Sequence, residues 1–255
     1  MGPVGLGPGV RIEVRDLSVT AVESRRRLLE RVDLTIAPGE RVAVIGHSGA
    51  GKTLLARAMV GVLPKGIVAT GEIACLLPQP YEQLEDNSPE AMRSRLVMVP
   101  QAAASSLPPL KSAVSLVREV LSWERRRGQI LLGSPMRPLN RVGFAPDSLA
   151  VRSLSYQLSG GMAQRVALAV ALATSAAVML LDEPTAGLDP IAAREIADLM
   201  RSLNEREGIT IVLATHNIRL AASLCPRFIV LRSGRIVAEG DPKELILSDD
   251  PYIRK

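Results

Sequence analysis

Apolar and polar residues alternate in two segments near the start of the chain, 10–19 and 32–36. Alternation with a period of two is typical of a strand that buries one face. Arg25-Arg26-Arg27, between these segments, is predicted to form a turn, and Pro38-Gly39 ends the second segment. The two strands predict an antiparallel layer that packs beside the rest of the protein.

Later strands are predicted from short apolar runs without alternation, which are typical of strands buried on both faces. These runs are 41–45, 96–99, 178–181 and 209–214. Helices are predicted between them, at 53–60, at 114–127, from 159 onward and at 190–206. Because strands alternate with helices, the pattern predicts an α/β fold with a mainly parallel sheet.

The remaining predicted elements are short. A strand is expected at 71–76, and a strand pair is expected around Ser233-Gly234. Asp241-Pro242 predicts the start of a final short helix, because Asp is a good N-cap and Pro is favoured at the first helical position.

Composition changes in the middle of the chain. Residues 78–90 are rich in Pro, Gln, Asp, Asn and Ser and are predicted as a surface loop. An irregular linker is expected at 102–109 and another loop at 133–138. We interpret 102–158 as a helical subdomain inserted into a core. The core is then formed by residues 1–101 and 159–255.

Bulk composition excludes several classes of protein. With 255 residues, 47% of them hydrophobic and 22% charged, the chain resembles an ordinary globular protein of one large or two small domains. Aromatic residues make up only 2%, which argues against stacking platforms for single-stranded nucleic acid, so no nucleic-acid partner is expected. The net charge of +5 leaves open a basic surface that faces lipid or an acidic partner, although a solvated surface is simpler.

The spacing of the cysteines does not predict a metal site, and the hydropathy of the sequence does not predict a membrane span. Cys75 and Cys225 are far apart and are expected to be reduced thiols. The first nine residues do not have the pattern of a signal peptide. The longest nearly apolar run, 166–181, has 16 residues and is interrupted by Thr174-Ser175, so it is short for a span. Any role at a membrane is therefore expected to require other subunits.

A phosphate-binding loop is the strongest chemical signal in the sequence. It lies between a predicted strand and a predicted helix and matches G-x-x-x-x-G-K-[ST] with Gly46, His47, Ser48, Gly49, Ala50, Gly51, Lys52 and Thr53. Its glycines let N–H groups point at phosphate oxygens, and the helix N-terminus adds partial positive charge. Lys52 is expected to reach the β- and γ-phosphates, and the Thr53 hydroxyl is expected to ligate magnesium.

Three further residues follow apolar strands, where the carboxyl edge of a parallel sheet opens onto its ligand crevice. Asp182 is expected to hold magnesium, and Glu183 is expected to act as general base on the attacking water. His216 is expected to contact the γ-phosphate and to orient that water. Carboxylates that only end a strand, and a structural histidine, are the simpler alternatives. The phosphate loop in the same chain favours catalysis.

A second anion site is predicted at Ser159, Gly160 and Gly161, where a serine and two glycines begin a helix. One nucleotide does not need two phosphate-binding sites in the same chain. The second site is therefore expected to serve the nucleotide of another subunit.

In their order along the chain, these motifs resemble those of the ATP-binding subunits of ABC transporters over nearly the full length. The correspondence is Gly46–Thr53 with the Walker A loop, Gln101 with the Q-loop, Leu158–Met162 with the signature motif, Val178–Asp182 with Walker B, Glu183 with the catalytic glutamate, Ala186–Asp189 with the D-loop and His216 with the switch histidine.

The resemblance implies an ABC ATPase fold, with a P-loop NTPase core, an antiparallel β layer and a helical subdomain. It implies that ATP and Mg²⁺ bind, that Gln101 senses the magnesium ion and the transmembrane partner, and that Asp189 belongs to the nucleotide site. It implies a second ATP-binding subunit, identical or different, which sandwiches two ATP molecules head to tail with the first. Transmembrane permease subunits, an extracytoplasmic substrate-binding protein and a peripheral position on the cytoplasmic face of the cell membrane are also implied.

Finer features are similar to those of peptide and nickel importers of the oligopeptide type. They are the segments 105–109, 156–165 and 250–252. This similarity implies uptake of peptides, nickel or a metal chelate. The chain departs from that family by ending at Lys255 without the cysteine-bearing extension of its longer members.

A second departure concerns the base of the nucleotide. The aromatic residue that stacks on adenine in this family should fall near Thr20-Ala21-Val22, and no aromatic residue is there. The nearest replacements are Arg25, Arg26 and Arg27, since a guanidinium plane can stack on a base, although a solvated turn is the simpler interpretation. We expect weak discrimination between ATP and GTP.

Two alternatives remain open at this point. A soluble ABC protein that acts on ribosomes or DNA usually fuses two cassettes or carries long coiled coils, and the sequence shows neither. A regulatory cassette with weak hydrolysis fits the missing aromatic residue, whereas the presence of Glu183 and His216 counts against it.

Overall fold

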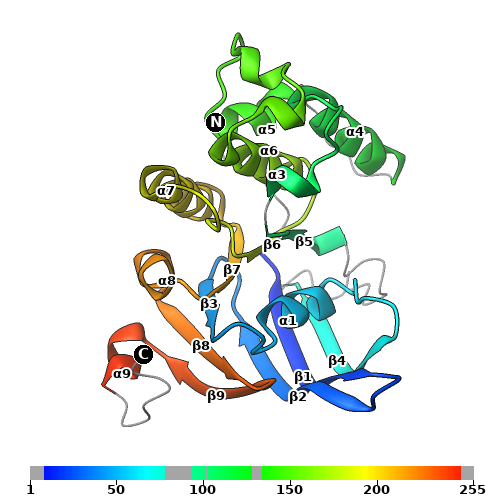
Figure 1. The fold of residues 1–255 in the computed structure, drawn as a ribbon, viewed down its shortest axis with the longest axis vertical. Helices are drawn as coiled ribbons and strands as arrows, with labels where there is room; N and C mark the ends of the chain where they lie inside the picture. Colours follow the sequence, from blue (N-terminus) through cyan, green and yellow to red (C-terminus); the bar gives the residue numbers. More distant parts are fainter. Residues whose placement is uncertain (1–8, 78–93, 102, 128–133, 248–255) are drawn as a thin grey trace.

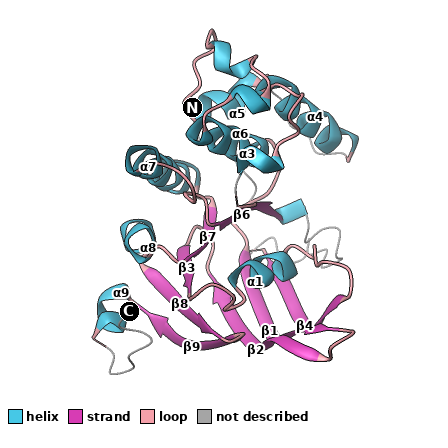
Figure 2. Ribbon diagram, in the orientation of Figure 1, coloured by secondary structure: helices cyan, strands magenta, loops and turns pink. Residues whose placement is uncertain are grey.

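Two β-sheets occupy one end of the molecule, and helices from the middle of the chain gather at the other end (Figures 1 and 2). The structure, a computed structural model, describes residues 9–77, 94–101, 103–127 and 134–247. The loop predicted at 78–90 and the segment 250–252 lie outside the described residues.

The larger sheet has six strands in the order β5-β6-β7-β3-β8-β9. Neighbouring strands from β5 to β8 are parallel, and β9 pairs antiparallel with β8 at one edge. Its strands are β3 (Arg41–Ile45), β5 (Leu96–Val99), β6 (Val178–Asp182), β7 (Thr210–Thr215), β8 (Arg227–Arg232) and β9 (Arg235–Gly240). The prediction of a mainly parallel sheet is confirmed.

The smaller sheet is antiparallel, as predicted, with the order β2-β1-β4. Its strands are β1 (Arg11–Ala21), β2 (Arg26–Ile36) and β4 (Ile67–Leu76). The predicted turn at Arg25–Arg27 was wrong in two of its three residues. Arg26 and Arg27 pair with Ala21 and Thr20, so they begin β2, and only Arg25 lies in the turn. β2 begins at Arg26 because its pairing with β1 continues as far as Ala21. Each added pair joins backbone N–H and C=O groups that would be hydrogen-bonded only to water if Arg26 and Arg27 lay in a turn.

The helices that pack on the larger sheet or at its edges are α1 (Lys52–Met59), α6 (Gly160–Leu172), α7 (Pro190–Glu207), α8 (Ile218–Leu224) and α9 (Pro242–Ile246). α1 and α7 lie close to their predicted limits, and α6 and α9 begin where helix starts were predicted. The sequence did not predict α8. The Asp241 side chain caps α9 by accepting a hydrogen bond from the Lys243 N–H, as expected of Asp before Pro.

The segment between β5 and α6 contains α3 (Ala103–Ser106), α4 (Ala113–Arg126) and α5 (Met136–Arg141). The helix predicted at 114–127 is confirmed. The irregular linker expected at 102–109 was wrong in part, because α3 lies within it. The loop expected at 133–138 was also wrong in part, since α5 begins at Met136. Pro138 is tolerated there because it lies in the first turn, where a helix needs no N–H donor.

Two apolar cores lie on opposite faces of the larger sheet, because alternate residues of each buried strand point to opposite sides. In β3, Val42 and Val44 face the smaller sheet and α1, whereas Ala43 and Ile45 face the core that contains α4 to α8. Strands buried on both faces explain the continuous apolar runs of the sequence. Along the part of the chain that the structure describes, no helix is both long and apolar enough to cross a membrane.

Candidate active site

A cleft of about 770 Å³ opens at the carboxyl ends of β3, β6 and β7, the edge of a parallel sheet where ligands bind. The loop between β3 and α1 forms one wall of this cleft. Gln101, Glu183 and His216, which the sequence predicted as site residues from three other segments, also line it. The fold therefore brings together residues that are up to 170 positions apart, from Gly46 to His216.

Two glycines of the loop lie where no other residue fits. A Cβ atom on Gly46 would stand 2.3 Å from the Leu231 carbonyl oxygen, and one on Gly51 would stand 2.6 Å from a methyl carbon of Leu29. Gly51 also has a φ of +109°, which glycine adopts without strain. The loop is thus packed against β2 and β8, while the N-terminus of α1 faces the cleft, an arrangement that suits an anion.

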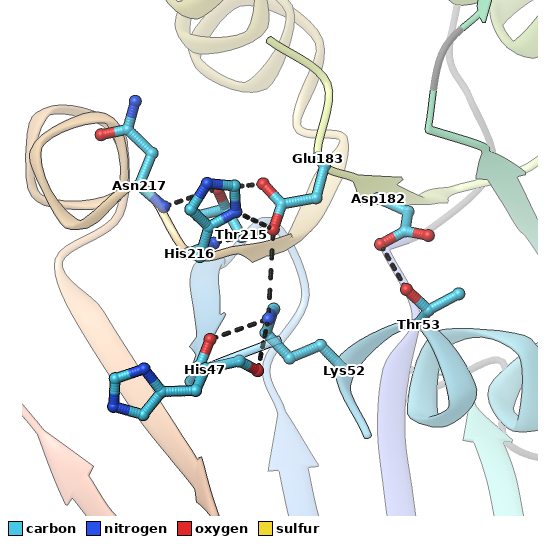
Figure 3. Close-up of polar contacts among 9 residues, drawn as sticks. His47, Lys52, Thr53, Asp182, Glu183, Thr215, His216 and Asn217 are labelled. Carbon is cyan, nitrogen blue, oxygen red and sulfur yellow. Dashed lines mark hydrogen bonds and ion pairs between the residues drawn. The ribbon is translucent and has the colours of Figure 1, made fainter. Parts of the chain in front are cut away.

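Lys52 lies at the floor of the cleft with its side chain 8% exposed. Its ammonium donates hydrogen bonds to the carbonyl oxygens of Gly46 (2.8 Å) and His47 (3.1 Å), and it lies 4.0 Å from Glu183 Oε1 (Figure 3). Burial lowers the pKa of Lys52, and the carboxylates of Glu183 and Asp182 oppose that shift. Phosphate oxygens brought into the cleft would stabilise the charged form further.

Thr53 and Asp182 meet behind the loop. The Thr53 hydroxyl donates a 2.9 Å hydrogen bond to Asp182 Oδ1 (Figure 3). Burial raises the pKa of Asp182, and the hydrogen bond from Thr53 opposes this rise. Thr53 and Gln101 line the cleft, and Asp182 is buried beside Thr53. Their hydroxyl, amide and carboxylate groups are oxygen donors of the kind that Mg²⁺ prefers, so the residues present fit that ion.

Glu183 is held in an unusual conformation. Its φ is +46°, a left-handed conformation that non-glycine residues seldom adopt. Oε2 accepts a 2.7 Å hydrogen bond from the Thr215 hydroxyl, and Oε1 accepts one of 2.8 Å from the His216 N–H. His216 Nδ1 lies 2.6 Å from Oε1 (Figure 3). These contacts fix the carboxylate beside Lys52, where a water next to a γ-phosphate could reach it.

Ser159, Gly160 and Gly161 lie in a separate hollow of about 220 Å³ that shares no lining residue with the first cleft. Ser159 caps α6 by accepting a hydrogen bond from the Met162 N–H. Asp189 lines the same hollow and caps α7 through the N–H groups of Ile191 and Ala192. One chain thus places its two predicted anion sites apart.

Sequence reasoning missed Thr215, which is buried and does not line the cleft but donates a hydrogen bond to Glu183. Its place at the end of β7, next to His216, was a usable signal. Arg26 and Arg27 were named as candidates to stack on the base, but the sequence placed them in a turn, whereas they line the cleft as residues of β2. Their contribution depends on how the two sheets pack, which the sequence pattern does not show.

These features define a P-loop nucleoside triphosphatase: a strand, a glycine-rich loop and a helix in succession, with a carboxylate at the end of a neighbouring strand. Comparisons with known proteins narrow this class. The chain matches the ABC transporter family over residues 29–186. It therefore belongs to the ABC transporter family, as an ATP-binding subunit that hydrolyses ATP.

Individual relatives agree with this assignment. A phosphonates import ATP-binding protein, PhnC of Trichormus variabilis, is 36% identical over 239 residues, which cover 90% of this chain and 92% of the relative. A probable peptide ABC transporter ATP-binding protein of Sinorhizobium fredii is 30% identical over 249 residues, which cover 95% of this chain and 74% of the relative.

Solved structures are similar as well. The structure of cbiO1 from Clostridium perfringens, described as part of the ABC transporter complex cbiONQ, has a TM-score of 0.73 and 27% identity, covering 94% of this chain and 92% of that one. The dimeric cassette MJ0796, in a post-hydrolysis state bound to ADP and Pi, has a TM-score of 0.70 and 26% identity, with coverages of 90% and 98%.

Proposed function

We propose that this subunit hydrolyses magnesium-bound ATP to drive uptake of a solute through permease subunits that are separate chains. The single observation that carries the chemistry is the arrangement of Glu183 between Lys52, Thr215 and His216 in the cleft. Support for import comes from the relatives, since PhnC of Trichormus variabilis is named as an import protein.

The cleft residues divide the work of phosphoryl transfer, which requires positioning and charge neutralisation above all. The loop N–H groups and Lys52 hold the β- and γ-phosphates. Thr53, Asp182 and Gln101 would hold a magnesium ion, and that ion would supply positive charge against the phosphates. Glu183 takes a proton from the attacking water, and His216 contacts the γ-phosphate and keeps the carboxylate in place.

The second hollow completes the site of a neighbouring subunit. Ser159, Gly160 and Gly161 approach the γ-phosphate of that neighbour's ATP, and Asp189 lies at the interface. We assign residues 1–101 and 159–255 to the nucleotide-binding core and 102–158 to the helical subdomain. Packing of α3, α4 and α5 against α6 supports a helical unit in this part of the chain.

The proposed location is peripheral, on the cytoplasmic face of the cell membrane, with an extracytoplasmic substrate-binding protein as a further partner. Two classes of cargo have support. The segments 105–109 and 156–165 favour peptides, nickel or a metal chelate, and one relative is named as a probable peptide transporter protein. Several other relatives are named for phosphonates. Purification of the tagged chain from membranes, with identification of the permease that accompanies it, would decide between them.

Glu183→Gln tests the proposed chemistry. The amide cannot take a proton, so we expect steady-state ATP hydrolysis of the assembled complex to fall about 10²- to 10⁴-fold while ATP still binds. Glu72→Gln, on an exposed residue of β4, is the matched control and should retain wild-type activity. A Glu183→Gln rate within about threefold of wild type would refute the assignment of the general base.

A further inference from the structure

The cleft is larger than a triphosphate requires, and its lining changes in character away from the phosphate loop. At about 770 Å³ it is the size of sites that enclose a whole small ligand. Beyond the loop it is lined on the side of β2 by Arg26, Arg27 and Leu28, and elsewhere by Ile218, Val230 and Ser233. No Phe, Tyr or Trp of the described residues lines it. A base that extends from the phosphate loop toward β2 meets two arginines there.

The strand that carries these arginines is fixed relative to the phosphate loop. The Gly234 N–H donates to the Ala50 carbonyl oxygen (3.0 Å), and the Glu30 N–H donates to the Gly234 carbonyl oxygen (2.9 Å). Leu29, next to Leu28, is fully buried and would contact any Cβ atom on Gly51. Because the loop, the β8–β9 turn and β2 are joined in this way, the start of β2 stays at a constant distance from the phosphates.

Of Arg25, Arg26 and Arg27, only Arg26 lines the cleft with a guanidinium that is not paired with a carboxylate. Arg25 lies in the turn and does not line the cleft. Arg27 lines it, but its guanidinium donates to Glu30 Oε1 (3.2 Å), which also pairs with Arg235 (2.7 Å). Within the described part of the chain, the exposed side chain of Arg26 lines the cleft and makes no ion pair or side-chain hydrogen bond.

We propose that Arg26 is the base-contacting residue of this nucleotide site, with its guanidinium plane stacked on the purine. A planar, weakly hydrated guanidinium stacks well on aromatic faces. Every purine presents such a face, so this contact does not distinguish adenine from guanine. The proposal rests on the proposed nucleotide site and adds to it the residue that binds the base. It also predicts that the subunit accepts GTP as well as ATP.

Binding of ADP, GDP and pyrophosphate to the full chain, with magnesium, tests this role without interference from hydrolysis. We expect ADP and GDP to bind wild type within about fivefold of one another. Arg26→Ala should weaken both nucleotides at least about fivefold. Its affinity for pyrophosphate, which lacks a base, should stay within about twofold of wild type. Arg26→Tyr, which supplies another stacking plane, should restore the affinity for both nucleotides.

Arg25→Ala removes a neighbouring charge that does not line the cleft, and it should leave all three affinities unchanged. The proposal is overturned if Arg26→Ala binds ADP like wild type, if it loses pyrophosphate and ADP in equal measure, or if Arg27→Ala alone produces the loss. Failure of the proposed nucleotide site itself looks different, because wild type would then bind neither pyrophosphate nor either nucleotide.

Discussion

At the scale of single residues, Glu183 combines backbone strain with a carboxylate that is hydrogen-bonded at both oxygens. A non-glycine residue at a φ of +46° costs about 1–3 kcal/mol. Its backbone N–H donates to the Ala214 carbonyl oxygen (2.8 Å), and both carboxylate oxygens accept hydrogen bonds from the residues that end β7 and follow it. These contacts offset the strain and hold the carboxylate in one orientation.

Thr215→Val tests whether that orientation matters for catalysis. The two side chains have nearly the same shape, but valine cannot donate to Glu183 Oε2. Since a hydrogen bond to a charged group is worth about 1.5–3 kcal/mol, we expect kcat to fall about 10- to 150-fold, with a much smaller change in KM. Steady-state ATPase kinetics of the assembled complex measure both constants.

The controls for Thr215 separate positioning from general loss of structure. Thr215→Ser keeps the hydroxyl and should recover most of the rate, whereas Thr70→Val changes an exposed threonine of β4 and should have no effect. Equal losses in Thr215→Val and Thr215→Ser would show that the methyl group, and not the hydroxyl, is what Thr215 contributes.

At the scale of elements, the turn Ser233-Gly234 between β8 and β9 joins the two sheets at the cleft. A Cβ atom on Gly234 would lie 2.4 Å from the Leu28 carbonyl oxygen, and the residue has a φ of +81°. β2 therefore packs directly on the backbone of this turn. Side-chain volume here would move β2 away from the phosphate loop.

Gly234→Ala should destabilise the protein by more than the backbone strain of a non-glycine residue at positive φ. Gly208, at the C-terminus of α7, is the matched control, because it has a φ of +70° and no atom within 4 Å of an added Cβ. Gly208→Ala should lower the free energy of unfolding by about 1–2 kcal/mol. Gly234→Ala should lower it by a further 1–3 kcal/mol or so from overpacking. It should also weaken ADP binding, which Gly208→Ala should not.

Chemical denaturation and ADP titration of the two glycine variants give these values. If both variants lose the same stability and both bind ADP like wild type, the close packing of β2 on the turn has no energetic role.

At the scale of the whole molecule, the cleft at Lys52 and the hollow at Ser159 are separate in one chain. The Ser159 hollow lies between the N-terminal ends of α6 and α7, on the side of the larger sheet where α3, α4 and α5 gather (Figure 1). Two chains arranged head to tail would place the Ser159 hollow of one opposite the Lys52 cleft of the other. The similar cassette MJ0796 is described as dimeric.

Dependence on protein concentration tests the composite site. If Ser159 and Gly161 complete the site of a second copy, the isolated monomer should be nearly inactive, and the ATPase rate should rise more than linearly with concentration. Initial rates over a dilution series, with the oligomeric state measured at each concentration, would show this. A specific activity that stays constant in a preparation shown to be monomeric would contradict the composite site.

The sequence by itself determined the fold class, and it named residues such as Lys52, Glu183 and His216 that the fold brings to one cleft. Short uninterrupted apolar runs are typical of strands buried on both faces, and the phosphate loop needs its glycines and Lys52 at fixed spacing. Asp182, Glu183 and His216 could be placed at the sheet edge because each follows such a strand. These features depend on local pattern and spacing, which can be read from the amino-acid sequence before the fold is known.

Only the tertiary structure decided the features that depend on contacts between distant segments. The orientation of the Glu183 carboxylate depends on Thr215, which lies 32 residues away along the chain. The helix at Met136–Arg141 forms where Pro138 and a loop-like composition suggested none, because its apolar residue Leu139 is buried in the core. The position of Arg26 follows from the pairing of β2 with β1 and from the packing of β2 on Gly234. No local pattern encodes such contacts, since their energy comes from surfaces that meet only after the chain has folded.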